Sequence, residues 1–198
     1  MSQIKQPQTK KGQETRKKIL ATAEEIFGEK GYFETSVVDI TQRAGVAQGT
    51  FYKYFPTKKD IYDELVYQLS RDLRLYIKEH MDRSEDFETT QRQGYLAFFK
   101  WVKNHQNLYS VIQQAVLVDP EIYRWYYEKL AAGFIKALED AMEKGECRRL
   151  DSETIAFCLM GIGQFIGMRW ILWDDKEVPE QVFEDAMEFA FRGINLTQ

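Results

Sequence analysis

Residues 35–55 read TSVVDITQRAGVAQGTFYKYF, and this stretch decides the fold expected for the N-terminal part of the chain. Its apolar residues predict two short helices, one opening at Ser36 and one spanning about Ala47 to Tyr54, joined by a tight turn at Gly45. Ser36 and Asp39 form a capping-box-like pair at the first helix start. Five apolar residues are expected to fix the helix crossing: Ile40, Ala44, Val46, Phe51 and Phe55. The stretch therefore predicts a helix-turn-helix.

The second of these helices carries residue types that contact DNA grooves. Phe51 and Phe55 are four residues apart and are expected to point inward. Gln pairs with adenine, Thr offers a methyl and a hydroxyl, Lys donates to guanine or phosphate, and Gly permits close backbone approach. The six residues expected over the remaining surface are Gln48, Gly49, Thr50, Tyr52, Lys53 and Tyr54. For the two tyrosines, packing between the helices remains the alternative.

Two lysines open the next predicted helix, which begins at Thr57. A cation in the first turn is unfavourable by roughly 0.3–1 kcal/mol, because the helix dipole is positive there. A phosphate bound at the same terminus would offset this cost. We therefore expect Lys58 to contact DNA phosphate and Lys59 to be solvated.

Residues 15–62 resemble the DNA-binding domain of the TetR family of transcriptional regulators. The resemblance is carried by Thr15-Arg16-x-x-Ile19-Leu20-x-x-Ala23-x-x-x-Phe27, Gly31-Tyr32 and Ala44-Gly45-Val46-x-x-Gly49-Thr50-Phe51-Tyr52-x-Tyr54-Phe55-x-x-Lys58-x-x-Ile61. It covers about a quarter of the chain without a gap. It implies DNA contacts from Val37, Gln48, Gly49, Thr50, Tyr52, Lys53, Tyr54 and Lys58. One departure is Ala47, where the family often has Ser, so the second helix lacks a side-chain N-cap.

Outward from this region, apolar residues recur at helical spacing and the fold class predicted is all-α, with about nine helices. The first helix is expected over about Glu14–Lys30, where Gly31 ends it in a left-handed conformation and Tyr32 packs behind. Beyond the helix at Thr57, helices are expected at about 86–104, 107–117, 120–144, 152–173 and 179–194. Pro56, Pro120 and Pro179 stand at or just before first turns, where a missing N–H costs nothing.

Charge divides the 198-residue chain. Residues 1–60 hold 11 Lys and Arg against 7 Asp and Glu, whereas the whole chain holds 27 against 31. The first 60 residues thus carry +4 and the remainder −8, which is typical of a basic DNA-binding segment on an acidic body, although chance clustering gives the same numbers. The domains expected are a basic flexible tail at 1–12, a helix-turn-helix domain at 13–56, and a ligand-binding and dimerisation domain at 57–198.

The apolar segment Ile155–Trp173 is long enough to suggest a transmembrane helix, but it contains Gln164 and Arg169 and lacks a basic flank. We expect a helix buried against its own core and a second subunit. The resemblance likewise implies a homodimer formed by the last two helices. The expected interface residues are Ile162, Ile166, Trp170, Phe183, Met187 and Phe191. Gly161, Gly163 and Gly167 would permit close helix approach or make room for ligand.

Aromatic residues concentrate in the body and suit an apolar pocket for a small hydrophobic effector. The pocket residues expected are Phe98, Trp101, Tyr126, Gly161, Phe165, Met168 and Arg169. Arg169 has two interpretations: it pairs with a carboxylate such as Glu184 or Glu188 or reaches solvent, or it binds an anionic group of the effector. Acyl-CoA-like, aromatic and cationic drug-like effectors all remain open.

The function expected is a regulator that binds palindromic operator DNA as a dimer, and repression relieved by effector is the family's usual mode. A ligand-responsive activator, an architectural DNA-binding module and an enzyme are the alternatives. No nucleotide-binding, metalloprotease or hydrolase motif is present in the sequence, and no cofactor or metal is expected. Met1 to Gly12 has no apolar signal-peptide core, and Cys147 and Cys158 have no metal or CxxC spacing, so a cytoplasmic protein is expected.

Overall fold

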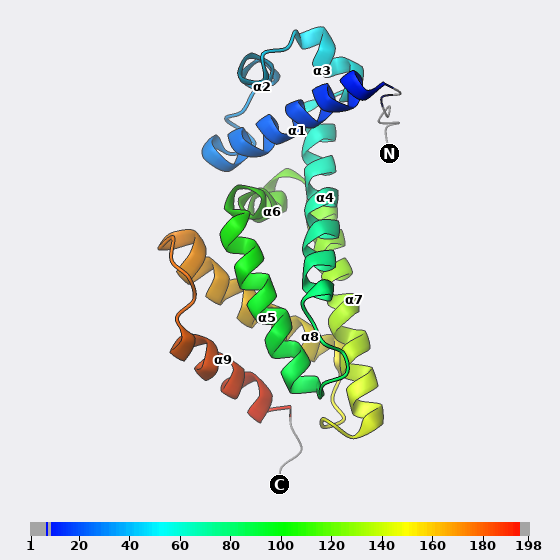
Figure 1. The fold of residues 1–198 in the computed structure, drawn as a ribbon, viewed down its shortest axis with the longest axis vertical. Helices are drawn as coiled ribbons and strands as arrows, with labels where there is room; N and C mark the ends of the chain where they lie inside the picture. Colours follow the sequence, from blue (N-terminus) through cyan, green and yellow to red (C-terminus); the bar gives the residue numbers. More distant parts are fainter. Residues whose placement is uncertain (1–6, 8, 195–198) are drawn as a thin grey trace. The chain divides into compact units, whose positions relative to one another are not determined.

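The computed structural model describes residue 7 and residues 9–194, and within these ranges the chain is helical with no strand. Nine α-helices and one π-helix follow one another there: α1 (Lys10–Lys30), α2 (Val37–Ala44), α3 (Gln48–Tyr54), α4 (Lys58–Glu79), α5 (Phe87–Asn104), α6 (Gln106–Val118), α7 (Pro120–Lys144), α8 (Ser152–Gly167), η1 (Met168–Trp173) and α9 (Glu180–Arg192) (Figure 1). The all-α prediction is confirmed. The chain forms two compact units, and it passes from one to the other within α4 and α7 and at the start of α6.

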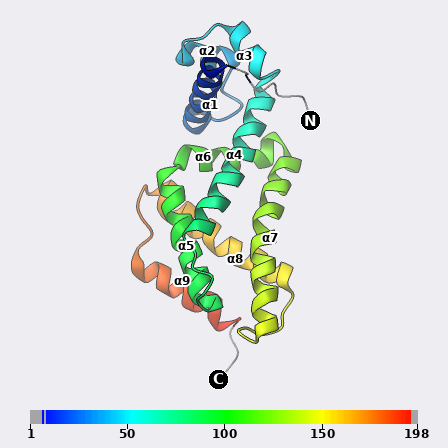
Figure 2. The ribbon, with the colours of Figure 1, turned by 45° about the vertical axis from the view of Figure 1, so that its right-hand side comes forward.

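The first unit contains the chain up to Leu69 together with Asn107–Tyr126. In it, α1, α2 and α3 contact one another and gather at the N-terminal end of α4 (Figures 1 and 2). The unit's core includes large apolar side chains that are at most 1% exposed, among them Ile19, Ile26, Phe27, Ile40, Phe51, Phe55, Ile61, Tyr62 and Leu65. Each such side chain contributes about 1.5–3 kcal/mol by leaving water.

The second unit contains Ser70–Gln106 and the chain from Tyr127 onward. Here α5 contacts α8 and η1, and α8 contacts α9. The Tyr95 hydroxyl of α5 donates to the carbonyl of Leu159 in α8 at 2.7 Å. Gly163 lets the helices approach, because a Cβ there would lie 3.1 Å from the Tyr95 ring. A Cβ on Gly161 would meet nothing within 4 Å, so this glycine faces open space.

Most helix boundaries agree with the sequence prediction, but two differ. Helix α1 begins at Lys10 rather than Glu14, because the Thr9 side chain accepts from the Gly12 amide and caps it. Residues 10–12 are therefore helical and do not belong to the expected tail, while residues 1–6 and 8 of that tail lie outside the described residues. Gly31 ends α1 with φ +84° and ψ 164°, a positive φ but not the left-handed helical conformation expected.

The second difference lies in the predicted helix 152–173, which is α-helical only to Gly167 and continues as the π-helix η1. Beyond it, Asp175 has a positive φ of 52°, and the Lys103 ammonium binds both its carbonyl and its carboxylate at 2.6 Å. Apolar periodicity does not distinguish such a wider π turn from a continuing α-helix. Ser152–Trp173 is long and apolar enough to cross a membrane, but the core helices of soluble proteins meet the same criterion of length and composition.

Candidate nucleic-acid interface

Helix α2 is fixed at both ends by local contacts. The Ser36 hydroxyl accepts from the Asp39 amide at 3.1 Å, and the Asp39 carboxylate accepts from the Ser36 amide at 2.8 Å, which completes the expected capping box. The Ser36 hydroxyl also donates to the Asp39 carboxylate at 2.6 Å, and this hydrogen bond, with the one from the Ser36 amide, lowers the pKa of Asp39 below its usual value. Gly45 ends the helix with φ 62° and ψ 40°, the left-handed conformation that the tight turn requires.

The two helices cross on a buried apolar contact, as expected. Ile40 and Ala44 of α2, and Phe51 and Phe55 at the end of α3, are fully buried. Helix α3 begins after Ala47, which makes no side-chain capping hydrogen bond, so the predicted lack of a cap is confirmed. The geometry is therefore a helix-turn-helix in which buried apolar side chains anchor the inner face of the second helix.

The residues expected to contact DNA fall into three groups by their exposure. Gln48, Gly49, Tyr52 and Lys53 are exposed, and the Tyr52 ring is 52% exposed. Val37, Thr50 and Lys58 are partly exposed. Tyr54 is only 5% exposed, and its hydroxyl lies 3.4 Å from where a Cβ on Gly12 would stand. The expectation that Tyr54 lies on the free surface is wrong, because this side chain packs against α1.

The two lysines at the start of α4 also differ from expectation. The Lys58 ammonium donates to the carbonyls of Tyr32 and Thr35 at 2.7 Å each, and it lies 4.1 Å from the centroid of the Tyr32 ring. Burial lowers the pKa of this ammonium. The charge from which a phosphate contact was inferred thus has partners inside the protein.

Lys59 was expected to be solvated, but it forms ion pairs instead. Its ammonium pairs with Asp63 at 2.7 Å and with Asp119. Asp119 also caps α7, because its carboxylate accepts from the amides of Glu121 and Ile122 at 2.9 and 3.3 Å. Lys59 therefore joins the start of α4 to the connection between α6 and α7 within the first unit.

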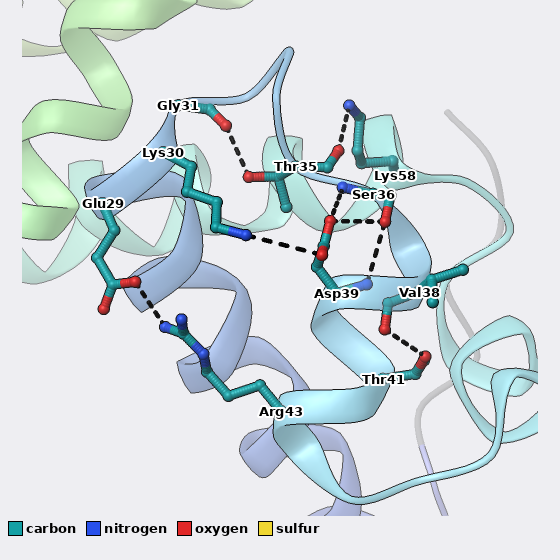
Figure 3. A network of polar contacts seen from close by, with 10 residues as sticks. All are labelled: Glu29, Lys30, Gly31, Thr35, Ser36, Val38, Asp39, Thr41, Arg43 and Lys58. Carbon is teal, nitrogen blue, oxygen red and sulfur yellow. Dashed lines mark hydrogen bonds and ion pairs between the residues drawn. The ribbon is translucent and has the colours of Figure 1, made fainter.

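Ion pairs also join α1 to its neighbours in the first unit. Figure 3 shows Arg43 of α2 directed at Glu29 of α1, a pair separated by 2.8 Å, and Lys30 directed at Asp39. Arg16 of α1 is buried beside Glu64 of α4 at 3.0 Å, and its guanidinium lies 4.9 Å from the Phe55 ring centroid. Arg16 belongs to the motif that resembles the TetR family, but the motif alone predicts no contact for it.

The residues expected at the dimer interface are not all available to a partner. Ile162, Ile166 and Trp170 are partly exposed, but Phe183, Met187 and Phe191 are buried within the second unit, at 6%, 0% and 1% exposure. The three α9 residues were misplaced because their stripe fills the unit's own core, where the Phe191 ring lies 6.1 Å from that of Phe87. Four large apolar side chains of α8, η1 and α9 are exposed instead: Phe157, Phe165, Trp173 and Phe189.

The expected pocket residues are likewise divided. Trp101 is buried, and Phe98 and Met168 are partly exposed. Phe165 is 65% exposed and Gly161 faces open space, so neither lines an enclosed cavity in this chain alone. Tyr126 is buried and belongs to the first unit. A cleft of about 220 Å³ in the second unit is lined by Asp86, Phe87, Glu88 and Glu146, which does not suit a hydrophobic molecule.

Arg169 makes a contact that sequence reasoning only half anticipated. Its guanidinium pairs with Asp174 at 2.7 Å and lies 4.4 Å from the Trp170 ring centroid. The interpretation that a carboxylate neutralises it is confirmed, although the partner is neither Glu184 nor Glu188. Those two acids pair with Arg92 and Arg192 instead.

A helix-turn-helix with an outward-facing second helix defines the class of protein: the chain is a DNA-binding transcriptional regulator. Residues 19–65 match the family model of the bacterial regulatory proteins of the tetR family. The chain is 30% identical over 177 residues to the HTH-type transcriptional regulator YvdT of Bacillus subtilis (88% of this chain, 91% of that one), and it belongs to the TetR family.

Two further comparisons agree. The regulator EthR of Mycobacterium tuberculosis is 30% identical over 177 residues, which cover 85% of this chain and 81% of EthR. The solved structure of the fatty acid degradation regulator FadR from Bacillus halodurans superposes with a TM-score of 0.80 at 21% identity, over 93% of this chain and 96% of that one. The latter likeness concerns the fold.

Proposed function

We propose that the protein is a cytoplasmic, homodimeric repressor that leaves a palindromic operator when a small hydrophobic effector binds its C-terminal unit. The observation that carries the DNA-binding part is the arrangement of α3. Its Phe51 is fully buried, while Gln48, Tyr52 and Lys53 are exposed on the outer surface. A recognition helix needs this division between a packed inner face and a polar outer face.

Within this proposal, Gln48 and Thr50 read base edges, and Gly49 allows the backbone to approach DNA. Val37, Tyr52 and Lys53 contact the sugar-phosphate backbone or groove walls. Lys58 supports the interface from inside, because its ammonium is bound to the Tyr32 and Thr35 carbonyls. Tyr54 has a supporting role, because it is buried against α1.

A homodimer is supported by the apolar surface of α8, η1 and α9. Phe165, Trp173 and Phe189 are 65%, 66% and 78% exposed, and a large exposed apolar area on a protein often marks a surface that a partner covers. Ile162, Ile166 and Trp170 contribute their partly exposed area. A partner subunit covering these residues also accounts for the apolar character of Ser152–Trp173 without a membrane.

For the effector we propose a molecule with a long acyl chain, held near Phe98, Trp101 and Met168 of the second unit. The support is the aromatic composition of α5 and the likeness to FadR, which is named for fatty acid degradation. Arg169 stays with Asp174 and does not bind the effector's head group.

The test begins with selection of duplexes from a random pool by the purified protein. A repressor dimer is expected to enrich a palindrome, and titration of long-chain acyl-CoA should then release the selected duplex. Coupling of roughly 1–3 kcal/mol would lower the affinity for DNA about 5- to 150-fold, and bound DNA must weaken acyl-CoA binding by the same factor.

Equal acyl-CoA affinity with and without the duplex would contradict the proposed effector. Enrichment of single half-sites would contradict binding as a dimer. A reporter behind the duplex separates repression from activation.

A further inference from the structure

The turn between α1 and α2, residues 31–36, connects the first helix to the helix-turn-helix. Its internal contacts are local: the Thr35 hydroxyl donates to the Gly31 carbonyl at 2.7 Å, and Thr35 is 1% exposed. Ser36 follows immediately and caps α2 (Figure 3). The position of this turn therefore decides where α2 begins.

Helix α6 holds one side of the turn through a single side chain. The Gln114 carbonyl oxygen accepts from the Tyr32 amide at 2.7 Å, and its NH₂ group donates to the carbonyls of Phe27 at 3.1 Å and Ser110 at 3.2 Å. Gln114 thus binds two backbone groups at the end of α1: the Tyr32 amide, and the Phe27 carbonyl, which also accepts from the Gly31 amide. A Cβ on Gly31 would lie 3.4 Å from the same side-chain oxygen, so the glutamine lies close against the turn.

Helix α4 holds the other side. Lys58 donates to the carbonyls of Tyr32 and Thr35, and its ammonium lies over the Tyr32 ring. The Tyr62 hydroxyl of α4 in turn donates to the Val111 carbonyl of α6. The amide of Tyr32 is bound from α6 and its carbonyl from α4, so both peptide groups of this residue are fixed.

We propose that Gln114 is a positioning residue for DNA recognition: through the α1–α2 turn, and together with Lys58, it sets the start of α2 without touching DNA. Helix α2 packs on α3 through Ile40 and Phe51, both fully buried, so displacement of α2 moves the recognition helix. Because Gln114 lies 82 residues beyond Tyr32 in sequence, this contact gives a remote part of the chain control over DNA affinity.

The test compares Gln114→Met with Val111→Ala. Methionine keeps the length and helix preference of glutamine but makes none of its three hydrogen bonds. Val111 is also on α6 and fully buried, and its apolar side chain makes none of the hydrogen bonds that hold the turn. Val111→Ala therefore destabilises the same helix while leaving the turn bound.

The first measurement is amide hydrogen exchange in the free protein. Gln114→Met is expected to accelerate exchange at Tyr32 and at the first amides of α2, whereas Val111→Ala is not. Unchanged exchange at Tyr32 in Gln114→Met would overturn the proposal. This measurement needs no DNA, so it stands even if selection from the random pool enriches nothing.

The second measurement is affinity for the duplex selected by the wild-type protein, well below the melting temperature of each variant. Losing two turn hydrogen bonds should weaken binding about 3- to 30-fold in Gln114→Met. The slope of log K against log salt should stay unchanged, since no phosphate contact is removed. Val111→Ala should keep the wild-type affinity. Wild-type affinity in Gln114→Met, or a reduced salt slope, would overturn the positioning role.

A double variant adds a third measurement. If Gln114 and Lys58 act through one turn, Gln114→Met and Lys58→Met together should weaken binding by less than the product of their separate effects. Strictly multiplicative effects would show that the two side chains act independently and would overturn the joint role.

Discussion

At the scale of single residues, capping decides how well the helix-turn-helix is formed. Ser36 caps α2 with its hydroxyl, whereas Ala47 opens α3 with no side-chain acceptor. Ala47 nevertheless has an extended backbone, with φ −69° and ψ 148°, which is the conformation an N-cap residue adopts. The position is therefore prepared for a cap that its side chain does not provide.

Ala47→Ser should raise the free energy of unfolding by about 1 kcal/mol, within a range of about 0.5–2, because the hydroxyl can accept from a free amide in the first turn of α3. Urea unfolding followed by circular dichroism measures the change. Ala47→Val, which supplies bulk without oxygen, should give no gain. Equal stability of the serine and valine variants would show that α3 does not use a cap.

At the scale of helices, the start of α4 is tied to the start of α7. Lys59 pairs with Asp119, whose carboxylate also caps α7. The hydrogen bond from Lys59 is the largest cause that lowers the pKa of Asp119. Asp63 shares the same lysine, but burial raises the pKa of Asp63. The pKa values of the two acids that share one ammonium are thus shifted in opposite directions.

Asp119→Asn should lower the free energy of unfolding near pH 7 by about 0.5–1 kcal/mol, a figure that allows for solvent screening of a partly exposed pair. Asparagine keeps an oxygen for the Glu121 and Ile122 amides, so the loss reports the charge. Because the folded pKa of Asp119 is lowered, its contribution is complete above the unfolded value of about 3.9 and disappears as pH falls through the folded value.

Urea midpoints of wild type and Asp119→Asn should therefore differ at pH 7 and converge toward pH 3. Lys59→Met gives the matched background, in which the Asn substitution should have little effect. A gap that stays constant over this pH range would mean that the charge of Asp119 is not responsible.

At the scale of the whole molecule, exposed apolar residues remain after each unit has packed its own core. Phe183, Met187 and Phe191 fill the core of the second unit, while Phe165 of α8 and Phe189 of α9 stay exposed. Burying each of these rings against a second subunit would stabilise a dimer by about 1.5–3 kcal/mol.

Phe165→Glu and Phe189→Glu should each shift the protein toward monomers in sedimentation at micromolar concentration, and should weaken binding to a palindromic duplex. Binding to a half-site duplex should change little, because each recognition helix is intact. Leu117→Glu, which changes an equally exposed residue of α6 (75%), should leave the dimer in place. Dimers that persist in both phenylalanine variants would place the subunit interface elsewhere.

The sequence by itself determined the helix-turn-helix, the all-α class and most helix ends. These depend on signals a few residues apart: Ser36 and Asp39 at a capping distance, Gly45 at the turn, and Phe51 four residues from Phe55. Local hydrogen bonds and helical periodicity are therefore readable along the chain.

Only the tertiary structure decided which side chains are free to act. It turned Tyr54 toward α1, gave Lys58 and Lys59 partners on distant segments, placed the α9 stripe in the core and brought Gln114 to Tyr32. These outcomes depend on contacts between residues far apart in the sequence, such as Lys58 with Thr35 and Gln114 with Tyr32, which are 23 and 82 positions apart. Periodicity identifies the apolar side of a helix, but the neighbouring helix decides whether that side fills a core or remains exposed for a partner.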